Sequence, residues 1–174
     1  MTPDFLAWAS RQWHEGAQFH WHAHGATPIK VVLFTTDGVP EMVDVRQGIG
    51  QEATGAAIRE HAQRIGAVAV AITAMSRMAD VEYDVPLPAV SPGLPLRPAV
   101  ARVVGEMTHS IVTLTVWPDR DVSMSLRSDI RTGAHRTAEL SPTVESGFTD
   151  PPQLTGLAAW LTGLLPTSRG SATS

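Results

Sequence analysis

The chain has no cysteine among its 174 residues. Disulfide bridges, thiolate nucleophiles and cysteine-ligated zinc are therefore excluded. Lysine is nearly absent as well, because Lys30 stands alone against twelve arginines. Catalytic motifs that depend on a lysine, such as the phosphate-binding P-loop or a Ser-x-x-Lys nucleophile, have no match around this residue.

An excess of positive charge is also missing, since the formal net charge is −4. A chain of this charge has no basic field to hold nucleic acid or anionic lipid, so neither is expected as a partner. The longest apolar stretch, near residues 66–75, is too short to span a bilayer. The first residues lack the basic and apolar regions of a secretory signal. We therefore expect a cytoplasmic protein without a membrane partner.

What the chain does contain is the composition of a globular protein, with 43% hydrophobic and 17% charged residues. Its length suits one domain with a core of ordinary size. We predict a single domain over residues 1–165, followed by a polar, disordered tail over residues 166–174.

The first half of the chain alternates helix and strand signals. Thr2 and Pro3 read as a cap and first residue of an amphipathic helix that ends near Gly16. Apolar strands are predicted at 29–34 and 42–46, joined by a turn at Thr36-Asp37-Gly38. The pattern then predicts a helix over Gln51–Ile65 and a central strand over 67–75.

The second half resembles a meander that ends in a helix. Five prolines between residues 80 and 98 predict a long loop. Strands are predicted at 100–107, 111–117 and 122–127, and residues 132–152 are expected to be irregular. A last amphipathic helix is predicted over 153–165. The fold class is therefore α+β, with a mostly antiparallel sheet of about five to six strands. It contains two hairpins and one β-α-β segment, and the N- and C-terminal helices pack on it.

The most prominent group of candidate ligands is the histidine triplet His20, His22 and His24. If this segment is extended, the three imidazoles point to one face and neighbours are about 7 Å apart. One metal ion would then be shared by His20 and His22, or by His22 and His24, with a further ligand from elsewhere. The candidates for that ligand are His14, Asp37, Asp44 and His109. The alternative is an ordinary surface loop, because the triplet is flanked by Gly25 and Pro28.

A second motif, Gly48-Ile49-Gly50-Gln51-Glu52-Ala53, has the G-x-G-x-x-A form of a dinucleotide fingerprint and precedes a predicted helix. Against nucleotide binding, the preceding strand alternates charged and apolar residues, whereas a central Rossmann strand is continuously apolar. An acid about 20 residues further on is also missing. Turn residues that lead into a helix are the simpler interpretation.

Three functions follow from these patterns. The first is a non-enzymatic α+β module that binds itself, a partner protein or a small ligand, with self-association across an exposed strand edge as its main form. The second is a metal-dependent hydrolase that uses the histidine triplet, with Asp37 or Glu41 as base. The third is nucleotide binding at residues 48–53. Of the five tryptophans, Trp8, Trp13 and Trp160 are expected in the core. Core packing is also the favoured interpretation of Trp21 and Trp117, with a pocket or interface as the alternative.

Overall fold

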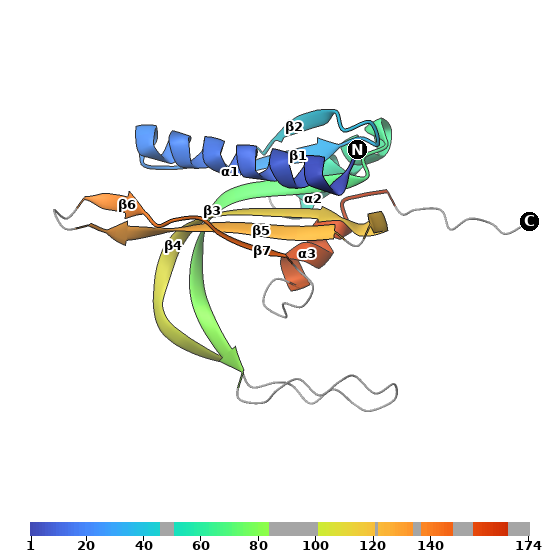
Figure 1. Ribbon diagram of the computed structural model, residues 1–174. Helices are drawn as coiled ribbons and strands as arrows, with labels where there is room; N and C mark the ends of the chain where they lie inside the picture. The colour runs from blue at the N-terminus through green and yellow to red at the C-terminus, as the bar shows by residue number, and fades with distance from the viewer. Residues whose placement is uncertain (46–50, 84–100, 121, 134–136, 148–154, 167–174) are drawn as a thin grey trace, which may run out of the picture.

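The computed structural model describes residues 1–45, 51–83, 101–120, 122–133, 137–147 and 155–166. Within these ranges the chain forms three α-helices and one seven-stranded sheet (Figure 1). The helices are α1 (Pro3–His24), α2 (Gln51–Ile65) and α3 (Thr155–Thr162). The strands are β1 (Lys30–Phe34), β2 (Pro40–Asp44), β3 (Ala69–Tyr83), β4 (Ala101–Trp117), β5 (Val122–Thr132), β6 (Ala138–Leu140) and β7 (Val144–Gly147). None of these helices is both long and apolar enough to cross a bilayer.

The sheet has the strand order β2-β1-β3-β4-β5-β6, and β7 also pairs with β5. Every pairing is antiparallel. The β1–β2 hairpin closes through the predicted turn, where the Gly38 amide donates to the Thr35 carbonyl at 2.9 Å. Gly38 has a φ of 87°, which glycine adopts without strain. The crossover from β2 through α2 to β3 passes over β1. The predicted α+β class and its β-α-β segment are confirmed.

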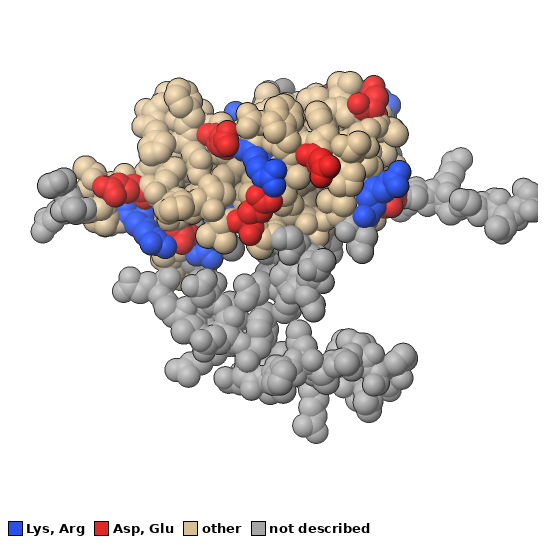
Figure 2. Space-filling view, in the orientation of Figure 1, with Lys and Arg blue, Asp and Glu red and all other residues tan. Residues whose placement is uncertain are grey.

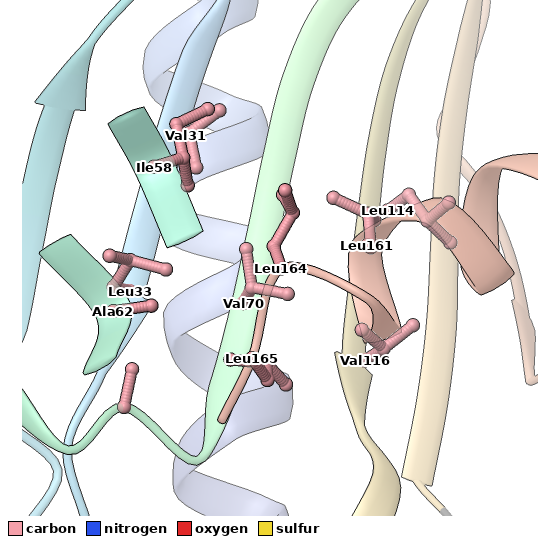
Figure 3. Packing of buried hydrophobic residues seen from close by; sticks show 11 residues of the cluster. Val31, Leu33, Ile58, Ala62, Val70, Leu114, Val116, Leu161, Leu164 and Leu165 are labelled. Atoms are coloured by element: carbon pink, nitrogen blue, oxygen red, sulfur yellow. The ribbon is translucent and has the colours of Figure 1, made fainter. Parts of the chain in front are cut away.

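Both faces of the sheet are covered by helices. Figure 3 shows α2 and α3 in front of the sheet and α1 behind it. The core under α2 and α3 is aliphatic, and its buried residues are Val31, Leu33, Ile58, Ala62, Ala67, Val70, Leu114, Val116, Leu161, Leu164 and Leu165. On the other face, α1 packs against β1, β3, β4 and β5 through two smaller clusters. Both sets of alternating residues in the central strands are therefore buried.

Between residues 80 and 147 the predicted elements are wrong in three places. The two strands predicted at 100–107 and 111–117 form one strand, β4, which pairs with β3 from Val70–Val116 to Tyr83–Ala101 with one register shift between Met78 and Asp80. Residues 80–83, predicted as loop, belong to β3, and the proline-rich remainder lies outside the described residues. Residues 138–147, predicted as irregular, add β6 and β7 along β5.

The ends of β3 and β4 extend beyond the sheet as a two-stranded arm (Figure 1). β1 pairs with β3 only up to Thr73, and β5 pairs with β4 only from His109 onward. In the described part of the chain, residues 80–83 and 101–104 therefore pair only with one another. The register shift beside them is typical of a bulge that bends a strand pair.

Candidate functional site

Helix α1 carries most of the candidate side chains, and it is longer than the sequence predicts. Thr2 caps its start by accepting a hydrogen bond from the Phe5 amide at 3.2 Å. It ends at Gly25, whose φ is 69° and whose amide donates to the Trp21 carbonyl at 2.7 Å. The predicted end near Gly16 is wrong, because one glycine costs a helix only about 1 kcal/mol. Burial of Ala17 and Trp21 against Ile111 favours continuation of the helix.

The extended conformation expected for the histidine triplet is therefore wrong as well. All three residues lie in the last two turns of α1. His20 and His24, four residues apart, share one face, and their ring centroids are 4.5 Å apart. His22 points elsewhere and packs edge-on against Trp21 at 5.1 Å. The helical conformation places His22 on a different side from His20 and His24. The pairs His20/His22 and His22/His24, which an extended chain would present to one metal ion, are therefore apart.

The predicted partner ligands and bases do not gather around these histidines. The Asp37 turn lies at the other end of α1, because the Met1 amino group donates to the Thr36 carbonyl at 2.6 Å. The 22 residues of α1 span about 33 Å. Glu41 accepts a hydrogen bond from His61 of α2 at 2.7 Å, on the face of the sheet opposite α1. Of the remaining candidates, His14 lies on the buried face of α1, Asp44 ends β2 and His109 lies on β4. Among the described residues, no three His, Asp or Glu side chains gather to hold a metal ion.

The predicted nucleotide fingerprint lies largely outside the described residues, which resume at Gln51. The helix expected after it is present as α2 with the predicted bounds. Strand β2, which precedes the motif, is at an edge of the sheet. A dinucleotide fingerprint normally follows a central strand, so this position gives nucleotide binding no support.

The inner face of α1 carries a buried polar network that the sequence analysis missed. The His14 ring is 1% exposed and lies between two hydroxyls. Its Nδ1 is 3.0 Å from Thr113 Oγ1, and its Nε2 is 3.0 Å from Ser128 Oγ. The Thr113 hydroxyl also bonds to Thr73 at 2.8 Å, and Gln18 Nε2 donates to Ser128 at 2.7 Å. One helix and three strands are joined by this chain of hydrogen bonds.

A separate buried polar contact lies one turn earlier on the helix. Ser10 Oγ donates to the Leu6 carbonyl at 2.7 Å, so it accepts from the Thr115 hydroxyl, also at 2.7 Å. Ser10, Thr113 and Ser128 are all 0% exposed. In the described part of the chain, no buried side-chain nitrogen or oxygen is left without a hydrogen-bond partner. The network is therefore complete, which is the condition under which buried polar groups stabilise one arrangement of a core.

Ser128 and His14 resemble the nucleophile and the base of a catalytic triad, but their environment argues against catalysis. Burial lowers the pKa of His14 from 6.5 to about 4, so the imidazole is a weak base. Its second nitrogen faces Thr113 where a catalytic triad places a carboxylate. Ser128 is inaccessible to a substrate. The network fixes the position of α1 on the sheet.

The outer face of α1 is unusual because it exposes two aromatic side chains. Trp8 is 55% exposed and Phe19 is 76% exposed. Gln12 and Glu15 lie between them on the same face and are joined by a hydrogen bond of 3.1 Å. The expectation that Trp8 lies in the core is wrong, whereas the core interpretation of Trp21 and Trp117 is confirmed by exposures of 6% and 5%. On the side shown in Figure 2, charged side chains are scattered and do not form one continuous region.

Gly16 is also exposed on this side of the helix. A Cβ built at Gly16 would meet nothing within 4 Å. A glycine within a helix lowers its stability, and no packing among the described residues requires one here. The β1–β2 hairpin borders the same region: Phe5 contacts Trp8 and Gly38, and Val39 and Met42 are about half exposed. We call Trp8, Gln12, Glu15, Gly16 and Phe19 the outer face of α1.

The two edges of the sheet are poorly suited to strand pairing. Thr35 donates to the Val39 carbonyl at 3.2 Å, so alternation along the hairpin directs the Pro40 nitrogen to the open edge. Pro40 therefore removes one of the few donors of this five-residue edge strand. At the opposite edge, Pro142 lies between β6 and β7, which have three and four residues. Short strands and prolines are common devices against edge-to-edge pairing.

One hollow of about 420 Å³ lies beside the α2–β3 connection, the β4–β5 turn and the end of α3. Its lining includes Ala67, Val68 and Leu165, and Asp119 is the one ionisable side chain among the described residues that line it. It contains none of the candidate site residues. A specific ligand site normally adds several convergent polar groups to an apolar lining, so the hollow supports no particular ligand.

No protein-family model, no curated protein and no solved structure matches this chain.

Proposed function

We propose that this protein is a non-enzymatic binding module that associates with a second copy of itself through the outer face of α1. The observation that carries the proposal is the exposure of Trp8 and Phe19 on one face of a helix that is otherwise firmly docked. Exposed tryptophan and phenylalanine are favoured where an interface forms, because each buries a large area with little loss of conformational freedom. Edge-strand pairing, our initial expectation, is replaced here by contact between side chains.

The spacing of the two aromatic residues favours an antiparallel pair of α1 helices. A two-fold axis near residues 13 and 14 brings Trp8 of one copy against Phe19 of the other, and the same contact repeats on the other side of the axis. Gly16 then lies beside Gln12 of the second copy. The missing side chain allows the two helices to approach closely, which gives the exposed glycine a reason that the single chain lacks.

Charge on and beside this face is compatible with the same arrangement. Arg11 and Glu15 lie on either side of the two-fold axis, so Arg11 of one copy comes near Glu15 of the other. In the single chain, Arg11 is held by Glu145 at 2.7 Å and 47% of its side chain is exposed. Complementary charges favour one relative orientation of two surfaces, even when they add little to the affinity.

The test is sedimentation velocity on the tag-free chain from micromolar to near-millimolar concentration. We expect a reversible dimer that is weakened at least tenfold in Trp8→Ala and in Phe19→Ala. Val144→Ala is the matched control, because Val144 is 62% exposed but lies on β7, away from α1. A monomer at every concentration, or a dimer that keeps its affinity in both aromatic variants, would refute the proposal.

The antiparallel orientation has its own test, made possible by the absence of cysteine. Asp4→Cys and His22→Cys leave the aromatic residues intact, and the proposed axis brings these two positions together. A mixture of the two variants should cross-link through a short bis-maleimide. Neither variant should cross-link alone, because equal positions are then more than about 25 Å apart along the helices. Cross-linking of the single variants would indicate a parallel pair instead.

A further inference from the structure

The face shared by His20 and His24 has a property that self-association does not use. We infer that these two residues form a binding site for one divalent ion of a late first-row transition metal, and that Cu²⁺ binds there most tightly. The site uses two imidazoles one helical turn apart, and water completes the coordination. His22 is not part of it. The inference is independent of the proposed function, because neither histidine belongs to the outer face of α1.

The first argument is geometric. Imidazole nitrogens bind zinc and neighbouring metals at about 2 Å, so two rings in adjacent coordination positions have centres about 4.5–5 Å apart. The rings of His20 and His24 have centroids 4.5 Å apart and an interplanar angle of 50°. The helix backbone holds this spacing, since residues at i and i+4 lie above one another on the helix surface. Little rearrangement is then needed when an ion binds.

The second argument is the hydrogen bond on the other side of the His20 ring. Nδ1 of His20 is 2.8 Å from the carbonyl oxygen of Ala26. A carbonyl can only accept, so Nδ1 carries the proton and donates, and the lone pair of His20 lies on Nε2. Metal-binding histidines usually donate their second N–H to a carbonyl or carboxylate in this way, which fixes the tautomer and the ring orientation. The αL turn at Gly25, which ends α1, directs the chain back so that this carbonyl reaches His20.

The ligand set determines the class of ion. Neutral imidazole suits copper, nickel and zinc, whereas calcium and magnesium require oxygen ligands. With equal ligands, affinity rises from nickel to copper and falls again at zinc. Two protein ligands leave several coordination positions to water.

The experiment titrates the tag-free full-length chain with Cu²⁺ and, separately, with Zn²⁺, and follows heat release and thermal stability. His20→Ala and His24→Ala should each raise the dissociation constant about tenfold or more, and His22→Ala should leave it unchanged. Electron paramagnetic resonance of the Cu²⁺ complex should show two imidazole nitrogens in the wild type and in His22→Ala. Circular dichroism of each variant checks that α1 stays helical, and His24→Gln replaces any variant that does not fold.

Three results would overturn the inference. They are no binding of either ion, equal losses in all three histidine variants, and a loss confined to His22→Ala. The same titration in Trp8→Ala separates this inference from the proposed function. If Trp8→Ala is monomeric and still binds Cu²⁺ with unchanged affinity, the metal site stands without the dimer. If the monomeric variant no longer binds the ion, His20 and His24 of a single copy are insufficient, and the inference is overturned.

Discussion

The imidazole of His14 and the hydroxyl of Thr113 are 99 positions apart in the chain and 3.0 Å apart in the structure, where both are buried. Their contact fixes the depth and rotation of α1 on the sheet. The inner face of the helix is thereby assigned to the core, and its outer face, with Trp8 and Phe19, is left to solvent. The proposed dimer surface is therefore a consequence of the polar network beneath the helix.

The pKa of His14 predicts an acid-sensitive fold. Burial holds this pKa at about 4 in the folded chain, below the ordinary value of 6.5. Between these values the unfolded chain binds a proton that the folded chain does not, so folding loses about 1.4 kcal/mol per pH unit as the pH falls. We expect the free energy of unfolding to drop by about 2 kcal/mol from pH 6.5 to pH 5, measured by urea denaturation.

The same experiment on His14→Gln supplies the control, because glutamine keeps hydrogen-bonding groups and does not titrate. This part of the slope should disappear in the variant. Asp37, Asp129 and Glu145 have lowered pKa values, and their stabilisation is lost only below their ordinary values of 3.8 to 4.5. They therefore do not interfere above pH 5. A wild-type His14 that titrates near 6.5 by NMR would contradict the prediction.

Removing the Thr113 hydroxyl tests whether the network stabilises the fold. Thr113→Val keeps the shape of the side chain but leaves His14 and Thr73 without this partner. We expect the free energy of unfolding to fall by about 2 kcal/mol, because an unpaired buried polar group costs about 1–3 kcal/mol. In a His14→Leu background the same substitution should cost clearly less. Equal costs in both backgrounds would show that the two side chains are not coupled.

Gly16→Ala should change two properties in opposite directions. Alanine has a higher helix propensity, and the position is open, so the monomer should gain about 0.5–1 kcal/mol of stability. The dimer should weaken, because the new methyl group lies where the second helix approaches. Urea denaturation of dilute protein and sedimentation velocity of concentrated protein measure the two effects. A variant that gains stability and dimerises as before would contradict close approach at Gly16.

Substitution of Arg11 tests whether its ion pair with Glu145 joins α1 to β7. Arg11 Nε and Nη2 donate to the two carboxylate oxygens of Glu145 at 2.9 and 2.7 Å. This hydrogen bonding is the main reason that the pKa of Glu145 is lowered. Arg11→Met should return that pKa to its ordinary range. The variant then lacks the part of the free energy of unfolding that the wild type loses as the pH falls through the lowered pKa. An NMR titration of the Glu145 carboxylate in dilute protein measures the change, and an unchanged pKa would contradict the docking.

Local signals in the sequence were sufficient for much of the fold. The predicted α2 has the observed bounds, because its apolar spacing and the following Gly66 act within the helix itself. The β1–β2 turn is equally local, since Gly38 supplies the positive φ that it requires. The end of α1 was misplaced for the opposite reason. Gly16 is a weak local stop, and burial of Trp21 against a strand about ninety residues away outweighs it.

The candidate sites depended on contacts that the sequence does not display. Thr113 and Thr115 alternate with apolar residues, a pattern typical of a strand with one buried and one exposed face. Both faces are buried here, because α1 brings Ser10 and His14 onto the threonines. The same docking determines that Trp8 is exposed and that His20 pairs with His24 and not with His22.

The sequence by itself determined the α+β class, the β1–β2 hairpin and the span of α2, because turn chemistry and the periods of helix and strand act between near neighbours. Only the tertiary structure decided the length of α1, the burial of its polar inner face and the exposure of its aromatic outer face. These depend on which distant strands the helix meets, and the hydrogen bonds that settle that choice join residues about a hundred positions apart.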